Sequence, residues 1–268
     1  MKKVLFLLSA LVWGLFGCQD GKPAKNAPPA GIALSFDDRY VEEWTLLRPL
    51  LKKYNAQATF YVTQFDSLST KEVEQLHQLV LDGHEIGAHG ATHTRVLDWL
   101  RGGGALEDFY RYEIESELLS MRKAGFKPVT FAHVGGQQTW FTDRRLLKDY
   151  FILLRDVSMT ERRVSGFTFR QPIFGIDDIY YHFDGDPKVH SLLIDQYTNI
   201  TDAQLKDGLI RAKNTQSVLM LLGHRPLFDA SDEPYAFSVN RLETLLAEAQ
   251  RMGLKSYTMA ELIQLSRR

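Results

Sequence analysis

The sequence is poor in cysteine, in net charge and in long apolar runs, and each shortage excludes a class of protein. Cys18 is the only cysteine among 268 residues, so no disulfide can form within the chain and its core must hold the fold. The formal net charge is −1, which does not predict the basic surface that a nucleic-acid partner requires. The apolar run Val4 to Gly17 has 14 residues, short of the roughly 20 that span a bilayer.

The N-terminus has the pattern of an export signal. Lys2 and Lys3 precede the apolar run, which leads directly into Cys18, and this order predicts a secretory signal peptide. The segment Leu15-Phe16-Gly17-Cys18 resembles the lipobox of bacterial lipoproteins, whose cysteine is lipidated and becomes the mature N-terminus. We therefore expect an exported protein, anchored by lipid to a membrane of the bacterial cell envelope, at the outer membrane or in the periplasm. The alternative is an ordinary signal peptide with an incidental cysteine.

The rest of the chain divides into a tether and one folded domain. Residues 19–30 (QDGKPAKNAPPA) contain three prolines and no large apolar side chain, which is typical of an extended tether. No second segment of this kind interrupts residues 31–268. The expected organisation is a signal peptide over 1–18, a tether over 19–30 and a single domain over 31–268.

Short β-rich runs alternate with amphipathic stretches in this domain, which predicts an α/β fold. Thr201 with Gln204, and Thr258 with Glu261, have the spacing of helix capping boxes. Alternation of this kind implies parallel strands with helices outside, either as a doubly wound sheet or as a barrel. Strands are predicted over 32–36, 58–62, 85–88, 129–134, 151–157, 218–222 and 254–257, and helices over 42–54, 71–81, 107–124, 203–213 and 241–251.

Polar residues that end apolar strands are the first candidates for chemistry, because active sites of α/β folds lie at the carboxyl ends of the strands. Asp37 and Asp38 end the first strand. One carboxylate could bind a metal while the other takes a proton, although adjacent aspartates are also common in turns and helix caps. His224 follows the run 218–222, and an imidazole pKa near 6.5 suits proton donation at neutral pH.

Two further histidines, His89 and His93, are four residues apart. On a helical turn this spacing would place both imidazoles on one face, where they could bind one metal ion. The alternative is a pair of unrelated surface histidines. The zincin motif His-Glu-x-x-His does not apply to His84 and Glu85, because its second histidine would fall on Ala88.

Together the motifs Ser35-Phe36-Asp37-Asp38, His89-Gly90-Ala91-Thr92-His93 and Leu222-Gly223-His224 resemble those of the polysaccharide deacetylase family, the NodB-homology enzymes. The resemblance implies a distorted (β/α) barrel and a hydrolase that releases acetyl groups. It also implies Asp38, His89 and His93 as ligands of one divalent metal, Asp37 as the base acting on water, and His224 as the acid. Zinc is the first expectation for the metal, with cobalt, nickel and manganese as alternatives.

The third motif of that family, Arg-x-Pro-Tyr-Gly in outline, is altered here. Ala132 replaces its arginine, and the strand continues His133-Val134-Gly135-Gly136. The resemblance leaves Gly135 as the main-chain donor to the oxyanion. Arg155, within the next predicted strand, could supply the missing guanidinium to a carboxylate or could lie on an outer face. Asp177-Asp178 and Asp184-Gly185-Asp186 lie in the region of the fourth motif, but both are equally consistent with turns.

The substrate implied is an acetylated glycan, with N- and O-linked acetyl groups both open. A carbohydrate-binding lipoprotein that has lost turnover, and a metal-dependent peptidase or esterase, are the alternatives. Trp99, Trp140, Tyr180 and Tyr181 could each stack on a sugar ring or belong to the core.

Lipidation of Cys18 can be tested by cell fractionation. The Cys18→Ala variant should move from the membrane fraction to the soluble fraction, because it loses the acylated side chain. Unchanged partition into the membrane would contradict the anchor.

Overall fold

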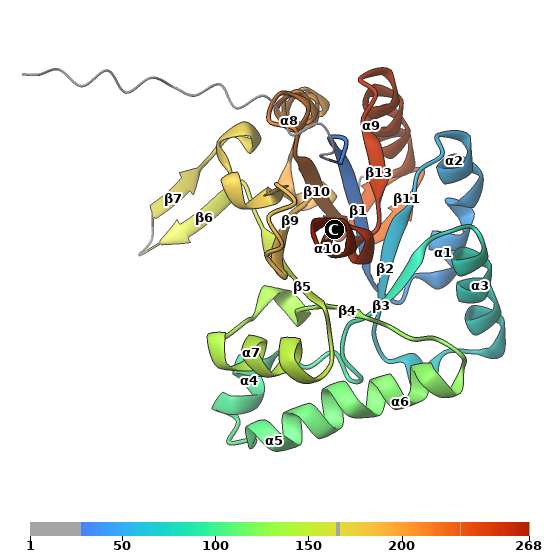
Figure 1. The fold of residues 1–268 in the computed structure, drawn as a ribbon, viewed down its shortest axis with the longest axis vertical. Coiled ribbons are helices and arrows are strands. Elements are labelled where there is room, and N and C mark those ends of the chain that lie inside the picture. Colours follow the sequence, from blue (N-terminus) through green and yellow to red (C-terminus); the bar gives the residue numbers. More distant parts are fainter. Residues whose placement is uncertain (1–27, 165–166, 231, 268) are drawn as a thin grey trace, which may run out of the picture.

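The protein is described by a computed structural model over residues 28–164, 167–230 and 232–267. The predicted signal peptide, Cys18 and tether residues 19–27 lie outside the described residues. Seven parallel strands form a closed barrel, because β10 pairs with both β9 and β1. This confirms the predicted (β/α) barrel (Figure 1). In spatial order the barrel strands are β1 (Gly31–Asp38), β2 (Ala58–Val62), β3 (Glu85–Ala88), β4 (Thr130–Ala132), β5 (Leu153–Ser158), β9 (Lys188–Leu193) and β10 (Val218–Gly223).

The barrel is distorted at the end where its strands begin. Strand β13 (Lys255–Tyr257) pairs with the first residues of β1, and β2 joins β1 only from Leu34 onward. In the same way β8 (Tyr180–Tyr181) runs antiparallel to the start of β10, while β9 pairs only with its later residues. Two short strands therefore fill the gaps between barrel strands that diverge at this end.

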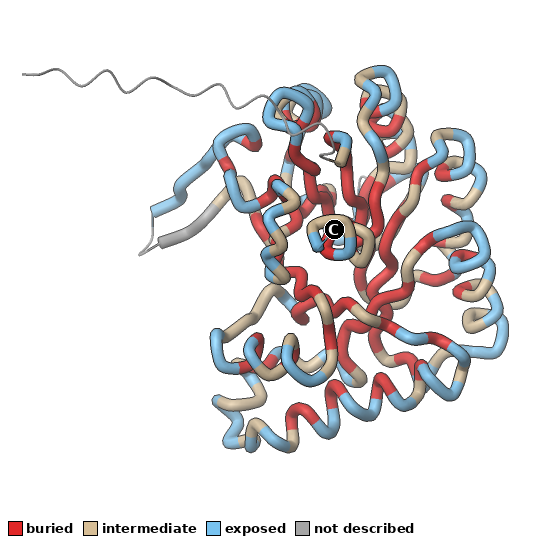
Figure 2. Tube along the Cα trace, in the orientation of Figure 1, coloured by how far each residue is buried: buried red, intermediate tan, exposed pale blue. Residues whose placement is uncertain are grey.

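Helices cover the outside of the barrel, with their buried faces toward the strands (Figure 2). The capping boxes of Thr201 with Gln204 and of Thr258 with Glu261 are both present, as predicted. The outer helices are α1 (Val41–Leu46), α2 (Arg48–Lys53), α3 (Thr70–Leu81), α4 (Val96–Arg101), α5 (Leu106–Phe109), the π-helical turn η2 (Tyr110–Glu115), α6 (Ser116–Lys123), α7 (Trp140–Asp149), α8 (Asp202–Asn214) and α9 (Val239–Arg251).

Several elements differ from the predictions. The helix expected over 42–54 is two helices, since Pro49 in the first turn of α2 cannot continue the hydrogen bonding of α1. The sequence analysis did not predict strand β9 or helices α4, α7 and α10 (Met259–Ser266). It also did not predict the hairpin of β6 (Glu161–Val164) and β7 (Phe167–Arg170). Strands β11 (Arg225–Leu227) and β12 (Ala236–Ser238) were not predicted either. None of the helices in the described part of the chain is long and apolar enough to cross a membrane.

Helix α10 closes the barrel at the end where the strands begin, and it lies at the centre of Figure 1. Its apolar residues Met259, Leu262 and Ile263 pack in one cluster with Ala33 and Tyr61 of the barrel interior. The opposite end, where the strands finish, is therefore the end at which polar side chains can meet solvent and a substrate.

Glu85 links α10 to the barrel strands. Its carboxylate accepts hydrogen bonds from the hydroxyls of Thr59 (2.9 Å) and Thr130 (2.6 Å) and from the N–H of Ala260 (2.9 Å) in the first turn of α10. Burial raises the pKa of Glu85, although these hydrogen bonds oppose the shift.

Glu85→Ala should destabilise the protein by about 1–3 kcal/mol, because it leaves buried donors unpaired. Thermal unfolding should show a lower melting temperature, with the exposed Glu74→Ala in α3 as the control. A melting temperature equal to that of wild type would show that α10 does not depend on this carboxylate.

Candidate active site

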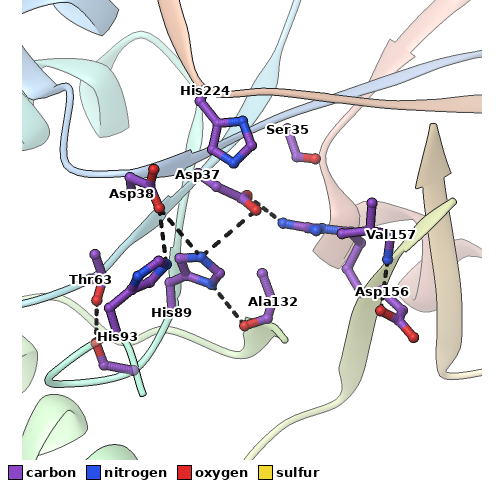
Figure 3. A network of polar contacts seen from close by, with 12 residues as sticks. Ser35, Asp37, Asp38, Thr63, His89, His93, Ala132, Asp156, Val157 and His224 are labelled. Atoms are coloured by element: carbon purple, nitrogen blue, oxygen red, sulfur yellow. Dashed lines mark hydrogen bonds and ion pairs between the residues drawn. The ribbon is translucent and has the colours of Figure 1, made fainter. Parts of the chain in front are cut away.

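Five side chains meet at the carboxyl end of the barrel (Figure 3). Asp37 and Asp38 end β1, His89 follows β3, His93 lies in the next loop, and His224 follows β10. Asp37 points into the barrel and is buried. Asp38 has φ of 86°, so the chain turns at this residue and both adjacent carboxylates face the same site, which a regular strand would not allow.

Asp38, His89 and His93 form the candidate metal cluster, since each offers a ligand atom within 4.8 Å of the others. The Nε2 atoms of His93 and His89 lie 3.1 and 3.7 Å from Oδ1 of Asp38. His89 Nδ1 donates to the carbonyl of Ala132 at 2.9 Å, which leaves its Nε2 lone pair for the cluster. Burial lowers the pKa of His89 despite the nearby Asp37 and Asp38, which favours the neutral imidazole.

The charge and surroundings of Asp38 also fit a cation. Burial opposes its ionisation, but the contact with His93 and the charges of His89 and His224 lower the pKa of Asp38 to about 2. Within the described part of the chain its buried Oδ1 has no hydrogen bond of good geometry. An ionised, buried oxygen that faces two imidazole nitrogens is a suitable ligand set for a divalent metal ion.

The two histidines do not share a helical turn, so that prediction was wrong. They lie in an irregular loop, and His93 has a left-handed φ of 59°. Two buried glutamates hold this loop: Glu117 accepts the N–H of Gly90 at 2.6 Å, and Glu113 accepts the N–H of Thr92 at 3.2 Å. A Cβ at Gly90 would lie 2.9 Å from Oε2 of Glu113, so a larger residue would displace the carboxylate.

Glu113 and Glu117 were not identified from the sequence. Glu113 lies in the π-helical turn η2, and Glu117 lies in the first turn of α6. A π-helical insertion is often found at functional sites. The sequence signal that could have identified them is their spacing, because the two glutamates are four residues apart on a helix face that is otherwise buried.

Arg155 lies inside the barrel and not on an outer face. Its Nη2 forms a hydrogen bond and ion pair with Oδ1 of Asp37, and both side chains are buried. Its guanidinium also lies 5.1 Å from the centroid of the Tyr61 ring. In the β4–β5 register Arg155 is the partner of Ala132. The guanidinium therefore comes from the same level of the barrel as Ala132, but from the next strand.

His224 has a buried carboxylate partner, Asp195, which the sequence analysis missed. Asp195 follows β9, contacts His224 Nδ1 through Oδ2, and accepts the His224 N–H through Oδ1 at 3.1 Å. Burial disfavours the imidazolium, but the hydrogen bond and charge of Asp195, with the charges of Asp37 and Asp38, raise the pKa of His224 to about 9.

The candidates for the fourth motif lie elsewhere. Asp177 forms an ion pair with Arg211 of α8, and Asp178 accepts a hydrogen bond from Ser158 at 3.1 Å. Asp184 accepts the N–H of Asp186 at 3.1 Å, as in a turn.

Gly135 lies in the 3-10 turn Val134–Gly136 that follows β4, with φ of 59°. This left-handed backbone conformation favours glycine. Among the aromatic residues considered above, Tyr180 and Tyr181 are core residues, Trp99 packs against the core and Trp140 is 75% exposed.

A family model for polysaccharide deacetylases matches residues 24–135. A protein from Mycobacterium smegmatis assigned to the polysaccharide deacetylases has a similar structure, with 16% identity, 90% of this chain and 92% of that chain covered, and a TM-score of 0.57. A family 4 acetyl xylan esterase from Clostridium thermocellum, in complex with a cobalt ion, has 20% identity, 87% and 90% coverage and a TM-score of 0.52. A CE4-family pseudoenzyme from Bacillus anthracis has 12% identity, 88% and 66% coverage and a TM-score of 0.54. No curated protein matches the sequence.

The family match and the shared fold confirm the resemblance to the polysaccharide deacetylases. The family model covers less than half of the chain, and the solved structures, which are 20% identical or less, show a shared fold. A pseudoenzyme with the same fold shows that the fold alone does not establish turnover, so the question of activity rests on the side chains of the site.

Metal binding by the cluster can be tested with His93→Ala. Removing one of three ligands should abolish most of the bound metal, measured by elemental analysis after reconstitution with zinc. The exposed His182→Ala should keep the wild-type metal content. Equal metal content in both variants would exclude His93 as a ligand.

The His224–Asp195 pair predicts a pH effect. In metal-free protein, Asp195→Asn should lower the pKa of His224 from about 9 toward or below 6.5, because burial then acts without the carboxylate. NMR titration of the imidazole would measure the change. Because the pKa of His224 is raised in the folded protein, this pair stabilises the fold at low pH. The excess stability of wild type over Asp195→Asn should therefore be largest below about pH 6.5 and should be lost as the pH rises through about 9. A His224 pKa unchanged in the variant would contradict the pairing.

Proposed function

We propose that the protein is a metal-dependent hydrolase that removes N- or O-linked acetyl groups from a carbohydrate polymer or oligosaccharide of the cell envelope. The observation that carries this proposal is that two further side chains lie beside the metal cluster: the buried carboxylate of Asp37, which is paired with Arg155, and the imidazole of His224, which is paired with Asp195. A base and an acid, each with its own partner, are what hydrolysis of an acyl bond requires.

Asp38, His89 and His93 would hold the ion, which when bound supplies Lewis-acid polarisation of the acyl carbonyl and of water. Zinc is the first expectation for these ligands, and cobalt, nickel or manganese would also suit them. The chain's own contribution is to keep the two imidazoles and the carboxylate in position through Ala132, Glu113 and Glu117.

Asp37 would take the proton of the attacking water. Arg155 binds its Oδ1, and its Oδ2 lies 3.8 Å from Nε2 of His89, on the side of the metal cluster. The guanidinium therefore orients the carboxylate and leaves the second oxygen for proton transfer. Gly135 is proposed as the main-chain donor to the oxyanion.

His224 would protonate the leaving group. Asp195 occupies its Nδ1, so Nε2 is the atom that can donate toward the site. With a pKa of about 9, the imidazole carries its proton at neutral pH and can transfer it to a departing amine or alkoxide.

The envelope location is part of the proposal and rests on the pattern of residues 1–18 with Cys18. The same pattern suggests residues 31–268 as the exported domain that meets the glycan.

Acetate release from acetylated xylan, chitooligosaccharides and peptidoglycan tests the activity. Asp37→Asn and His224→Ala should each lower kcat by at least about 100-fold, because positioned general acids and bases contribute roughly 10²- to 10⁴-fold. Both should retain the wild-type metal content, and the exposed Asp149→Asn should keep full activity. If the metal-loaded wild type binds glycan but releases no acetate, the protein is a carbohydrate-binding lipoprotein and not a hydrolase. Cleavage of peptides without release of acetate would indicate a peptidase.

A further inference from the structure

Arg155 crosses the barrel interior to reach Asp37, and the strands beside it give its guanidinium no polar support. Its register partners are Ala132 on β4 and Val189 on β9, which are both apolar. Its Nη2 contacts Asp37, but its Nε and Nη1 are buried and have no hydrogen-bond partner among the described residues. A buried cation with unpaired donors is unfavourable, so a further contact is needed to hold the guanidinium in this position.

The aromatic ring of Tyr61 supplies that contact. Tyr61 is the register partner of Asp37 on the neighbouring strand β2, so the carboxylate and the ring enter the barrel side by side. The Cζ atom of Arg155 lies 5.1 Å from the centroid of the ring, within the roughly 6 Å over which a cation–π contact acts. Both side chains are 0% exposed, and such a contact is strongest when the cation is removed from water.

The Tyr61 side chain attracts the guanidinium through its ring and not through a charge. Burial raises the pKa of Tyr61 well above its ordinary value, although the charge of Arg155 opposes the shift. The side chain is therefore the neutral phenol, whose ring face carries the partial negative charge of the π system.

Gly87 provides the space for this ring. It is the register partner of Tyr61 on β3, and a Cβ at this position would lie 2.4 Å from Cδ1 and Cε1 of the ring. Any larger residue would therefore displace the ring, and with it the face on which the guanidinium lies. Because Gly87 lies within a regular strand, it is space, and not backbone conformation, that favours glycine here.

The ring and the ion pair hold the arginine in different ways, and the difference bears on the proposed reaction. Asp37 loses its charge when it takes the proton of the attacking water, and its attraction for the guanidinium then weakens. The attraction between the guanidinium and the ring does not depend on the charge of Asp37. The ring therefore keeps Arg155 in place during the step in which the ion pair is weakest.

We propose that Tyr61 is a positioning residue of the active site, whose ring holds Arg155 against Asp37, and that Gly87 keeps the ring in place. The inference rests on the proposed role of Asp37 as the base. It extends that role to the residues that support the arginine by which the base is oriented.

The test measures acetate release by metal-loaded protein on the acetylated glycan that the wild type hydrolyses fastest. Tyr61→Leu, which removes the ring, should lower kcat by roughly 3- to 30-fold, in line with the strength of a cation–π contact, with KM and metal content unchanged. Tyr61→Phe, which retains the ring, should keep most of the activity, and Gly87→Ala should resemble Tyr61→Leu. Tyr257→Leu is the matched control, because it removes another fully buried tyrosine of the same apolar cluster and should lower the melting temperature but not kcat.

A double-mutant cycle separates positioning from a general loss of packing. If the ring acts through Arg155, Tyr61→Leu should cause no further loss of kcat in an Arg155→Ala background. An equal loss in both backgrounds would overturn the proposal, and so would a wild-type kcat in Tyr61→Leu.

An NMR measurement tests the contact without activity. The Nε–H signal of Arg155, assigned by its absence in Arg155→Ala, should shift in Tyr61→Leu and in Gly87→Ala, because the ring current no longer acts on it in the same way. It should stay near its wild-type position in Tyr61→Phe and Tyr257→Leu. If no glycan releases acetate, the proposed hydrolase fails and this signal alone decides the contact: an Nε–H signal that is unchanged in Tyr61→Leu and Gly87→Ala would overturn it.

Discussion

The ion pair between Arg155 and Asp37 lies in the barrel interior, where each unpaired charge would cost several kcal/mol. Ala132 and Arg155 are register partners on the adjacent strands β4 and β5, so both lie at the same level of the barrel. The guanidinium binds one oxygen of Asp37 and turns the other toward His89. The orientation of the proposed base relative to the metal cluster therefore depends on this contact.

Outside the barrel, buried carboxylates perform the corresponding task for the histidines. Glu113 and Glu117 hold the backbone of the loop that carries His93, and Asp195 holds His224 from the end of β9. The interior of the barrel thus positions the proposed base, and the loops around its rim position the proposed metal ligands and the proposed acid.

The sequence predicts the features that depend on neighbouring residues. The apolar runs of β1 and β10 are local, and so are the polar residues that end them, which is why the α/β alternation and the positions of Asp37 and His224 followed from the pattern. The pattern left a doubly wound sheet and a barrel open, and the barrel was implied by the resemblance to the polysaccharide deacetylases. Strand β9 was missed because His190 and Ser191 interrupt its apolar run, and Asp195 was missed with it. The irregular loop of His93 could not be predicted, because its conformation depends on Glu113 and Glu117, which are distant in sequence. Arg155 was expected either to replace the arginine that orients the catalytic aspartate or to lie on an outer face, and the closed barrel, in which it contacts Asp37, decides between these alternatives.

The most direct test moves the arginine from position 155 on β5 to position 132 on β4, and it measures kcat/KM for acetate release with metal-loaded protein. Arg155→Ala should lose at least about 100-fold while it retains metal. The double variant Ala132→Arg/Arg155→Ala should recover part of the loss, because β4 presents its side chain at the same level of the barrel. Full activity in Arg155→Ala would contradict the dependence of the site on this ion pair, and a double variant no better than the single one would contradict the exchange between strands.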